Sequence, residues 1–351
     1  MTAPVLTADA TTVRAIAAGR RARRRRRTLV VAGLGVAVLA AFAAALMIGD
    51  AFYSPDEVLR VLAGQAVPGA SFTVGDLRLP RASLAVLSGL AFGLAGVTFQ
   101  TMLRNPLASP DVIGISAGAG AAAVAGIVLF SLQPAAVSLL AVAGALITAA
   151  AIYLLAHRGG FAGTRLILIG IGVGAMLTSV TTWVLSRAAA WDLQAATRWL
   201  TGSLNAAAWP SIVPLAVASV VLVPLLLAQS RALGTLRLGD DTATGLGVRT
   251  GRTRILALIA AVTLLAVATS AAGPIAFVAF MSGPIAVRLV GPSTALPAAS
   301  GLVGALLVTV ADLVGRFAFE GRYPVGVVTG VLGAPFLVFL LIRLNRSGAS
   351  L

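Results

Sequence analysis

The stretch RLPRASLAVLSGLAFGLAGVTFQTMLRNPLASPDVIGISAGAG, from Arg78 to Gly120, joins two apolar segments through a short polar break. Each apolar segment is long enough to cross about 30 Å of hydrocarbon as a helix. Asn105 and Pro106 are expected to end the first helix, because proline lacks the amide hydrogen that a continuing helix needs. Pro110 and Asp111 are expected to begin the second helix. The stretch therefore predicts two membrane helices joined by a tight hinge.

The rest of the chain repeats this alternation of apolar and polar segments. The sequence is 59% hydrophobic and 11% charged, with a mean hydropathy of +1.00, which excludes an ordinary soluble domain. We expect an all-α polytopic membrane protein with about ten transmembrane helices. They cover approximately residues 29–49, 82–103, 111–130, 135–156, 165–186, 211–229, 254–272, 275–290, 295–315 and 325–343.

The distribution of arginine predicts the orientation of these helices. All 26 basic residues are arginine, and eight of them lie between Arg14 and Arg27. With the N-terminus inside, 19 arginines fall in cytoplasmic segments and 7 in outer ones, as the positive-inside rule requires. The placement of arginines in cytoplasmic segments explains the net charge of +15 better than nucleic-acid binding does. Both termini are therefore expected in the cytoplasm, and the arginine tract could also anchor to anionic lipid.

The sequence divides into a membrane domain and two tails. An arginine-rich cytoplasmic tail is expected over residues 1–28, the transmembrane domain over 29–346 and a short tail over 347–351. A cleaved signal peptide would share the basic start, but its apolar core is usually only about 7–15 residues, so the first span is expected to be retained. The outer segment 50–81 contains SPDEVLRVLAG, a helix start signal. The polar segment 230–254 is expected to be a cytoplasmic loop.

The residue types that are missing exclude several functions. Without lysine the chain cannot carry a standard phosphate-binding P-loop, and without cysteine it has no thiolate chemistry. Asp312 is the main acidic candidate within a span, and Arg316 follows one helical turn later. We favour a helix-surface ion pair for these two residues. An ion-coupled secondary transporter would have to use Asp312, and a membrane enzyme lacks an acid/base pair. Energy for uphill transport should therefore come from another chain.

One span is unusually rich in small residues. LIGIGVGAMLTSV, from Leu168 to Val180, could pack closely against neighbouring helices. It could instead form the wall of a translocation pathway. The candidate pathway residues are Gly170, Gly172, Gly174, Thr178 and Ser179.

The opening stretch resembles the signature region of ABC-importer permeases for ferric siderophores, haem and vitamin B12, the FecCD-type family. Later segments resemble the family as well, including LGDDTATGLGV from Leu238 and PVGVVTGVLGAPFLVFLL from Pro324. The resemblance covers nearly the whole chain after residue 50. One departure is Ile285, which stands where the family often has histidine. The matching elements of the opening stretch are Arg-Leu-Pro-Arg at 78–81, Gly96, Gln100, Asn-Pro-Leu-Ala at 105–108, Pro110, Asp111, Gly114 and Ser-Ala-Gly at 116–118.

The resemblance implies a type II ABC-importer permease with two docking surfaces. On the outer face, arginines would meet acidic residues of a substrate-binding protein, unless they hold headgroups or the local carboxylates of Asp76 and Asp312. These arginines are Arg78, Arg81 and Arg316. On the inner face, a short coupling helix would seat in an ATPase subunit, unless the segment is an ordinary solvated loop. The coupling residues would be Asp240, Asp241, Ala243, Leu246 and Gly247.

The resemblance also implies the partners of the chain. ATPase subunits would bind ATP and Mg²⁺, and this chain would bind no cofactor or metal itself. An extracytoplasmic binding protein or lipoprotein would deliver the cargo, which we expect to be a ferric siderophore, with haem and vitamin B12 as the alternatives. A second permease, identical or homologous, would complete the pathway in the bacterial cytoplasmic membrane. The partners would include membrane lipid and exclude nucleic acid.

Overall fold

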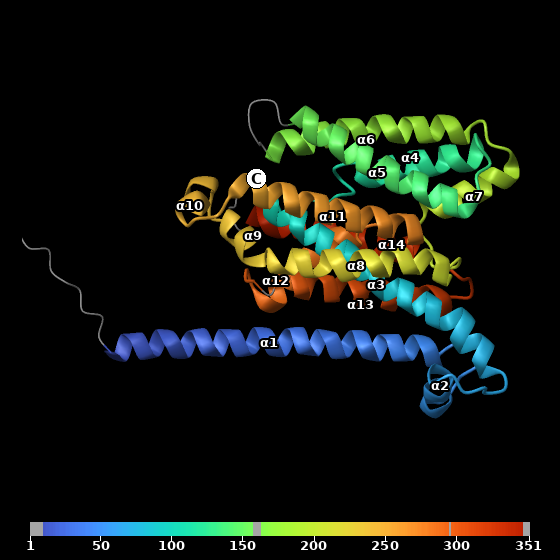
Figure 1. The fold of residues 1–351 in the computed structure, drawn as a ribbon, viewed down its shortest axis with the longest axis horizontal. Coiled ribbons are helices and arrows are strands. Elements are labelled where there is room, and N and C mark those ends of the chain that lie inside the picture. The colour runs from blue at the N-terminus through green and yellow to red at the C-terminus, as the bar shows by residue number, and fades with distance from the viewer. Residues whose placement is uncertain (1–9, 157–162, 295, 347–351) are drawn as a thin grey trace, which may run out of the picture.

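The computed structural model describes residues 10–156, 163–294 and 296–346. These residues form helices and contain no strand (Figure 1). The predicted tail 347–351 and the first nine residues of the predicted tail 1–28 lie outside them. The elements are α1 (Ala10–Met47), α2 (Pro55–Leu62), the π-helix η1 (Ser71–Arg78), α3 (Leu79–Met102), α4 (Ile115–Val128), α5 (Pro134–Ala156), α6 (Gly163–Leu185), α7 (Ala190–Leu200), α8 (Trp209–Ala228), α9 (Ser230–Leu236), α10 (Asp240–Gly245), α11 (Thr250–Ala272), α12 (Val278–Val290), α13 (Leu296–Phe317) and α14 (Val325–Arg346).

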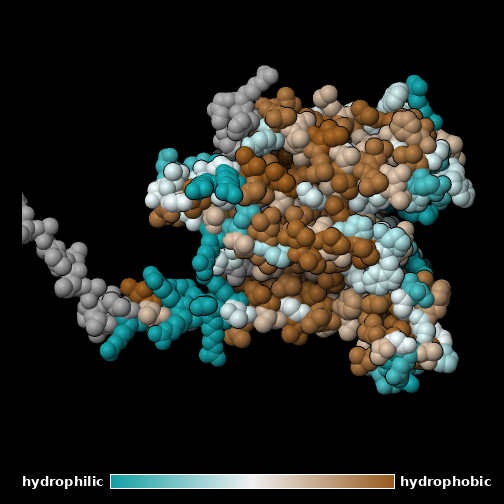
Figure 2. All heavy atoms as spheres, viewed as in Figure 1, coloured by the Kyte–Doolittle hydropathy of each residue, from teal (hydrophilic) through white to brown (hydrophobic). Residues whose placement is uncertain are grey.

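The predicted all-α polytopic fold is confirmed. Eight helices of the described residues are long and apolar enough to cross a membrane, and η1 and α3 together form one of them. Two shorter apolar helices, α4 and α12, occupy the third and eighth predicted spans. Figure 2 shows an apolar band across the visible face, with hydrophilic side chains gathered at its two ends.

The two ends of the bundle differ in their elements. The N-terminal half of α1 lies at the same end as α9 and α10, which we call the α10 end (Figure 1). Helices α2 and α7 lie at the opposite end, called the α2 end. Helix α1 runs without a break from the arginine tract into the first span. At 1.5 Å per residue, the 18 residues before Thr28 extend it by about 27 Å.

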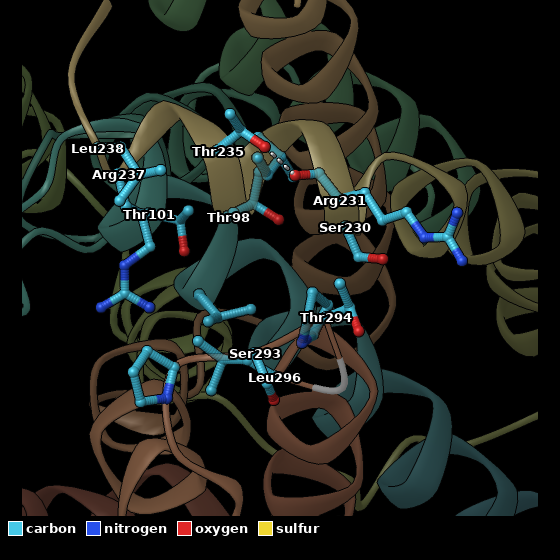
Figure 3. A pocket seen from close by; sticks show the side chains of 15 residues that line it. Thr98, Thr101, Ser230, Arg231, Thr235, Arg237, Leu238, Ser293, Thr294 and Leu296 are labelled. Carbon is cyan, nitrogen blue, oxygen red and sulfur yellow. Dashed lines mark hydrogen bonds between the residues drawn. The ribbon is translucent and has the colours of Figure 1, made fainter. Parts of the chain in front are cut away.

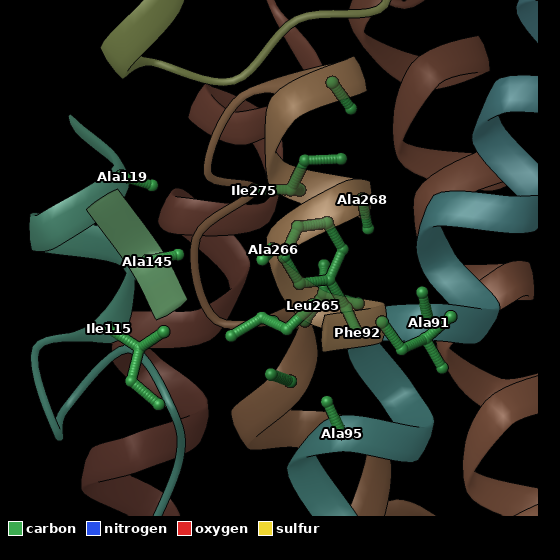
Figure 4. Packing of buried hydrophobic residues seen from close by; sticks show 14 of the residues in the cluster. Ala91, Phe92, Ala95, Ile115, Ala119, Ala145, Leu265, Ala266, Ala268 and Ile275 are labelled. Carbon is green, nitrogen blue, oxygen red and sulfur yellow. The ribbon is translucent and has the colours of Figure 1, made fainter. Parts of the chain in front are cut away.

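Helix α3 lies at the centre of the bundle and packs against α13 through small residues. A Cβ atom on Gly89 would come within 2.4 Å of the Gly304 carbonyl oxygen, and one on Gly93 within 2.3 Å of the Ser300 carbonyl oxygen. Ser300 Oγ also donates a hydrogen bond to the carbonyl of Gly93, at 2.8 Å. Small residues allow this approach, which replaces the hydrophobic effect in lipid. On another side of α3, Phe92 packs near Leu265 of α11 (Figure 4).

Helix α3 approaches α12 just as closely at two positions of the family motif. A Cβ atom on Gly96 would lie 1.8 Å from the carbonyl oxygen of Ala279. One turn later, buried Gln100 donates from Nε2 to the carbonyl of Phe280, at 3.0 Å. A Cβ atom on Gly283 would in turn lie 1.8 Å from Gln100 Oε1. Gly96 and Gln100 therefore hold α12 against the central helix.

The hinge after α3 matches the prediction at its first half only. Helix α3 ends at Met102, and Asn105 Oδ1 accepts a hydrogen bond from the amide of Leu107, at 2.8 Å. The predicted helix start at Pro110 and Asp111 was wrong, because α4 begins at Ile115. Gly114 has a φ of +85°, a left-handed conformation that a helix starting earlier could not contain.

The segments at the α2 end contain one predicted helix and one that the sequence did not reveal. Helix α2 begins at the predicted start signal: Ser54 Oγ accepts from the amide of Glu57, and the Glu57 carboxylate accepts from the amide of Ser54. This reciprocal pair is a capping box. Helix α7, which contains Trp191 and Trp199, was not predicted.

Candidate functional site

The α10 end is organised around the carboxylate of Asp240. Arg254 of α11 donates two hydrogen bonds to it, from Nη1 to Oδ2 and from Nη2 to Oδ1, each at 2.7 Å. Arg104 also donates to Asp240 Oδ1 and, through Nε, to the carbonyl of Leu236 at 2.9 Å. This arrangement, the Asp240 clip, ties the end of α3 to α10 and to α11. Two-point guanidinium–carboxylate pairs are strong and fix orientation as well as distance.

The clip also sets the charge state of Asp240. Hydrogen bonds from Arg254, with the charges of Arg254 and Arg104, lower the pKa of Asp240 below its ordinary value of 3.8. The clip therefore contributes its full stability above that value and loses it as the pH falls through the lower folded-state pKa. Asp240 stays ionised and paired throughout the physiological range.

Of the other predicted coupling residues, one is buried and the rest are exposed. Ala243 is fully buried and packs with Met102, Leu233 and Leu236. The side chain of Leu246 is 64% exposed although it is apolar. These positions place one face of α10 against the bundle and leave its end open to a partner.

Asp241 and Gly247 lie on the open side of the same loop. Asp241 is exposed and makes no side-chain hydrogen bond or ion pair with the described residues. Gly247 has a φ of +83°, so a side chain there would strain the turn that follows α10. Arg104 and Arg254, which hold the loop in place, were missed as site residues.

At the α2 end, the main partner of Asp312 is Arg81 rather than Arg316. Arg81 donates to both carboxylate oxygens, from Nε to Oδ2 at 2.8 Å and from Nη2 to Oδ1 at 2.7 Å. Its Nη1 reaches Asn205 Oδ1 at 2.8 Å. Arg316 Nη1 lies 4.0 Å from Asp312 Oδ2. The predicted ion pair with Arg316 is therefore the weaker of the two, because its atoms lie farther apart. Asp312 itself is buried.

Arg78 is buried, unlike the exposed arginine that docking on the outer face would require. Its guanidinium donates to the carbonyls of Leu46 at 2.9 Å, Met47 at 2.8 Å and Ala51 at 2.6 Å. It also lies over the ring of Tyr53, 4.9 Å from the ring centroid. Arg78 therefore closes the C-terminal end of α1, whose last carbonyls lack helical partners. Asp76 is exposed and does not pair with it.

The candidate pathway residues of α6 lie on two faces. Gly170 and Gly174 are buried against the turn before α4: a Cβ atom on Gly170 would lie 2.7 Å from the Ile113 carbonyl oxygen. The close-packing interpretation therefore holds for these two glycines. Gly172 and Ser179 are exposed on the other face of α6, and Thr178, one turn after Gly174, is exposed at the edge of the packed face. Both hydroxyls donate to carbonyls one turn earlier in the helix.

Among the described residues, no group of three His, Cys, Asp or Glu side chains could hold a metal ion. The ionisable groups instead form structural clips at each end of a many-span bundle, and α10 is presented at one end. These features agree with the predicted membrane permease architecture.

The chain belongs to the FecCD transport family, whose model matches residues 11–343. It is 40% identical over 291 residues to the ferric enterobactin transport system permease protein FepG of Escherichia coli (strain K12), covering 83% of this chain and 88% of FepG. It is 41% identical over 310 residues to the achromobactin transport system permease protein CbrC of Dickeya dadantii (strain 3937), covering 87% and 89%. Since these relatives are permease proteins, the chain is a transport permease and not an enzyme.

A solved structure supports the fold. A metal-chelate type ABC transporter in an inward-facing conformation matches with a TM-score of 0.81 and 24% identity, covering 90% of this chain and 99% of that one. At that identity the likeness extends to the arrangement of the helices, which agrees with the predicted permease architecture.

Proposed function

We propose that this chain is the permease subunit of an ATP-driven importer that carries a ferric siderophore delivered by an extracytoplasmic binding protein. The cargo is inferred from relatives such as FepG, which is named for ferric enterobactin transport. Haem and vitamin B12 are the alternatives within the family. The α10 end, which carries the arginine tract, faces the cytoplasm, because short arginine-rich segments stay inside. Partner ATPase subunits bind ATP and Mg²⁺ there.

The observation that carries the proposal is that α10 is fixed to the bundle on one side and exposes two leucines on the other. The Asp240 clip fixes the start of α10, and buried Ala243 fixes its inner face. Leu238 and Leu246 flank the helix, and each is 64% exposed. Two exposed leucines at a rigid polar tip form a small apolar contact surface of the kind that partner proteins bury. A force applied to α10 reaches α3 and α11 through Arg104 and Arg254.

Leu246→Asp is expected to abolish retention of the ATPase while the permease stays folded. Losing a central apolar contact costs about 2 kcal/mol or more, or about 30-fold in affinity. The measurement is co-purification of the ATPase with the permease in mild detergent. Leu59→Asp in α2 is the matched control, because Leu59 is 65% exposed at the opposite end. Undiminished retention by Leu246→Asp would refute the coupling surface.

On the outer face, we propose that Arg316 contributes to docking of the binding protein. Its side chain is 17% exposed, and Asp312 is already satisfied by Arg81.

Arg316→Gln is expected to slow binding-protein association about tenfold at low salt, because rim charges act mainly on the association rate. The control is Arg187→Gln, whose guanidinium lies over Trp183 at the same end. Equal rates for the two variants would remove Arg316 from the docking surface.

The exposed face of α6 is proposed to line the pathway together with a second permease, identical or homologous. Gly172 and Ser179 lie on that face, and Thr178 lies at its edge. The hydroxyls of Thr178 and Ser179 are already bonded within the helix. Such a wall offers a passing solute no fixed charge to bind. Cross-linking cysteines placed at Gly172 and Ser179 to a second permease copy would support this arrangement. Cross-linking of neither position in the assembled transporter would contradict it.

A further inference from the structure

Two cavities lie side by side at the α10 end and share part of their lining. The first, of about 620 Å³, lies between the end of α3, helix α9 and the turn before α13. The second, of about 460 Å³, lies between α3, α12 and the end of α14. Both are lined by Val97, Thr101, Arg237 and Leu296. Figure 3 shows Arg237 and Arg231 on opposite sides of the first cavity, with the hydroxyls of Thr101 and Ser230 between them.

The groove has a high positive charge. Among the described residues that line it, none is acidic, and five are arginine: Arg104, Arg231, Arg237, Arg288 and Arg343. Arg104 shares its charge with Asp240. The guanidinium of Arg237, which borders both cavities, makes no hydrogen bond or ion pair with the described side chains. We call this set of cavities the arginine groove.

The arginine groove also has an apolar floor, formed by Val97, Val287 and Leu340, and it lies at the α10 end of the apolar spans. Arg288 lies over the ring of Phe339, 4.9 Å from the ring centroid, and Phe339 is 48% exposed on α14. On another side, Arg27 of α1 donates to the carbonyl of Val290 at 3.2 Å. A charged rim above an apolar floor matches an amphipathic ligand better than a soluble ion.

We propose that the arginine groove binds the phosphodiester headgroup of an anionic phospholipid from the leaflet that borders the α10 end. Guanidinium groups match phosphate oxygens in two-point hydrogen bonds. Basic pockets between membrane helices on the cytoplasmic side are recognised sites for such headgroups. The lipid phosphate pairs with guanidinium groups such as that of Arg237, and its glycerol and acyl chains lie along the apolar floor. Lipid binding here is independent of the proposed cargo, and the groove borders the proposed ATPase contact surface at Leu238.

The test is native mass spectrometry of the purified full chain in detergent, titrated with dioleoylphosphatidylglycerol or dioleoylphosphatidylcholine. We expect the wild type to retain phosphatidylglycerol at concentrations where phosphatidylcholine is lost. The double variant Arg237→Gln/Arg288→Gln is expected to bind phosphatidylglycerol about 30-fold more weakly, since each arginine near the surface contributes about fivefold. Arg249→Gln/Arg252→Gln is the matched control, because these arginines are exposed at the same end and do not line the groove.

Four results would overturn the proposal. Equal retention of the two lipids by the wild type would show that no anionic headgroup is selected, and this comparison needs no variant. Equal losses in the two double variants would show that only the overall surface charge acts. Displacement of phosphatidylglycerol by millimolar inorganic phosphate would assign the groove to a soluble anion. If lipid binding is unchanged in the groove variant and retention of the ATPase falls, the arginines serve a protein contact instead.

Discussion

Asp240→Asn is expected to reduce ATP-dependent uptake at least about tenfold and to lower the stability of the permease. Asparagine removes the charge that Arg254 and Arg104 share, and Arg254 is buried. Because Asp240 is 45% exposed, water screens part of the loss, and we expect a cost of about 1–3 kcal/mol. The larger effect is on transport, since α10 loses its fixed position relative to α3 and α11.

The measurement pairs a thermal melt in detergent with uptake by the assembled transporter. Asp241→Asn is the matched control for stability, because it is the same substitution at an exposed neighbour without an ionic partner among the described residues. We expect only Asp240→Asn to lower the melting temperature. Wild-type stability and wild-type uptake of Asp240→Asn would show that the Asp240 clip neither stabilises the permease nor couples α10 to α3 and α11.

Gly96→Ala is expected to prevent the permease from accumulating in the membrane. The added Cβ atom would lie 1.8 Å from the Ala279 carbonyl oxygen, which is backbone and cannot rotate away. Helices α3 and α12 would have to separate, which would also break the Gln100 hydrogen bond to Phe280. Overpacking of this kind costs about 3 kcal/mol or more when the backbone has to move.

Expression in the membrane fraction and the melting temperature measure this effect. Gly33→Ala in α1 is the matched control, because a Cβ atom there meets nothing within 4 Å and alanine is the better helix former. Normal accumulation and melting of Gly96→Ala would mean that α3 and α12 are not packed as the structure has them.

Local patterns allowed much of the fold to be predicted. The membrane spans could be predicted from the apolar segments, because length and hydropathy alone decide whether a helix can cross the membrane. The start of α2 was predicted because a capping box is formed by residues three apart, Ser54 and Glu57. The start of α4 was placed too early because Gly114, in a left-handed conformation, packs against α6. That contact joins distant parts of the sequence and leaves no local pattern.

The site was less predictable, since its contacts are long-range. Asp240 was selected correctly as a member of the loop, but Arg104 lies 136 residues before it. In the same way, Arg78 and Arg81 look alike in the sequence, yet one closes α1 and the other binds Asp312 of α13. Only the packing of the helices shows which carbonyl or carboxylate each arginine binds.

The most direct test of the proposed function is uptake of a radiolabelled ferric siderophore into proteoliposomes. They would contain this permease, its partner permease and the ATPase, with the binding protein added outside. We expect uptake that requires both ATP on the ATPase side and the binding protein, and that persists when a protonophore collapses the proton gradient. Uptake that proceeds without ATP and stops with the protonophore would contradict the proposal and would assign energy coupling to Asp312.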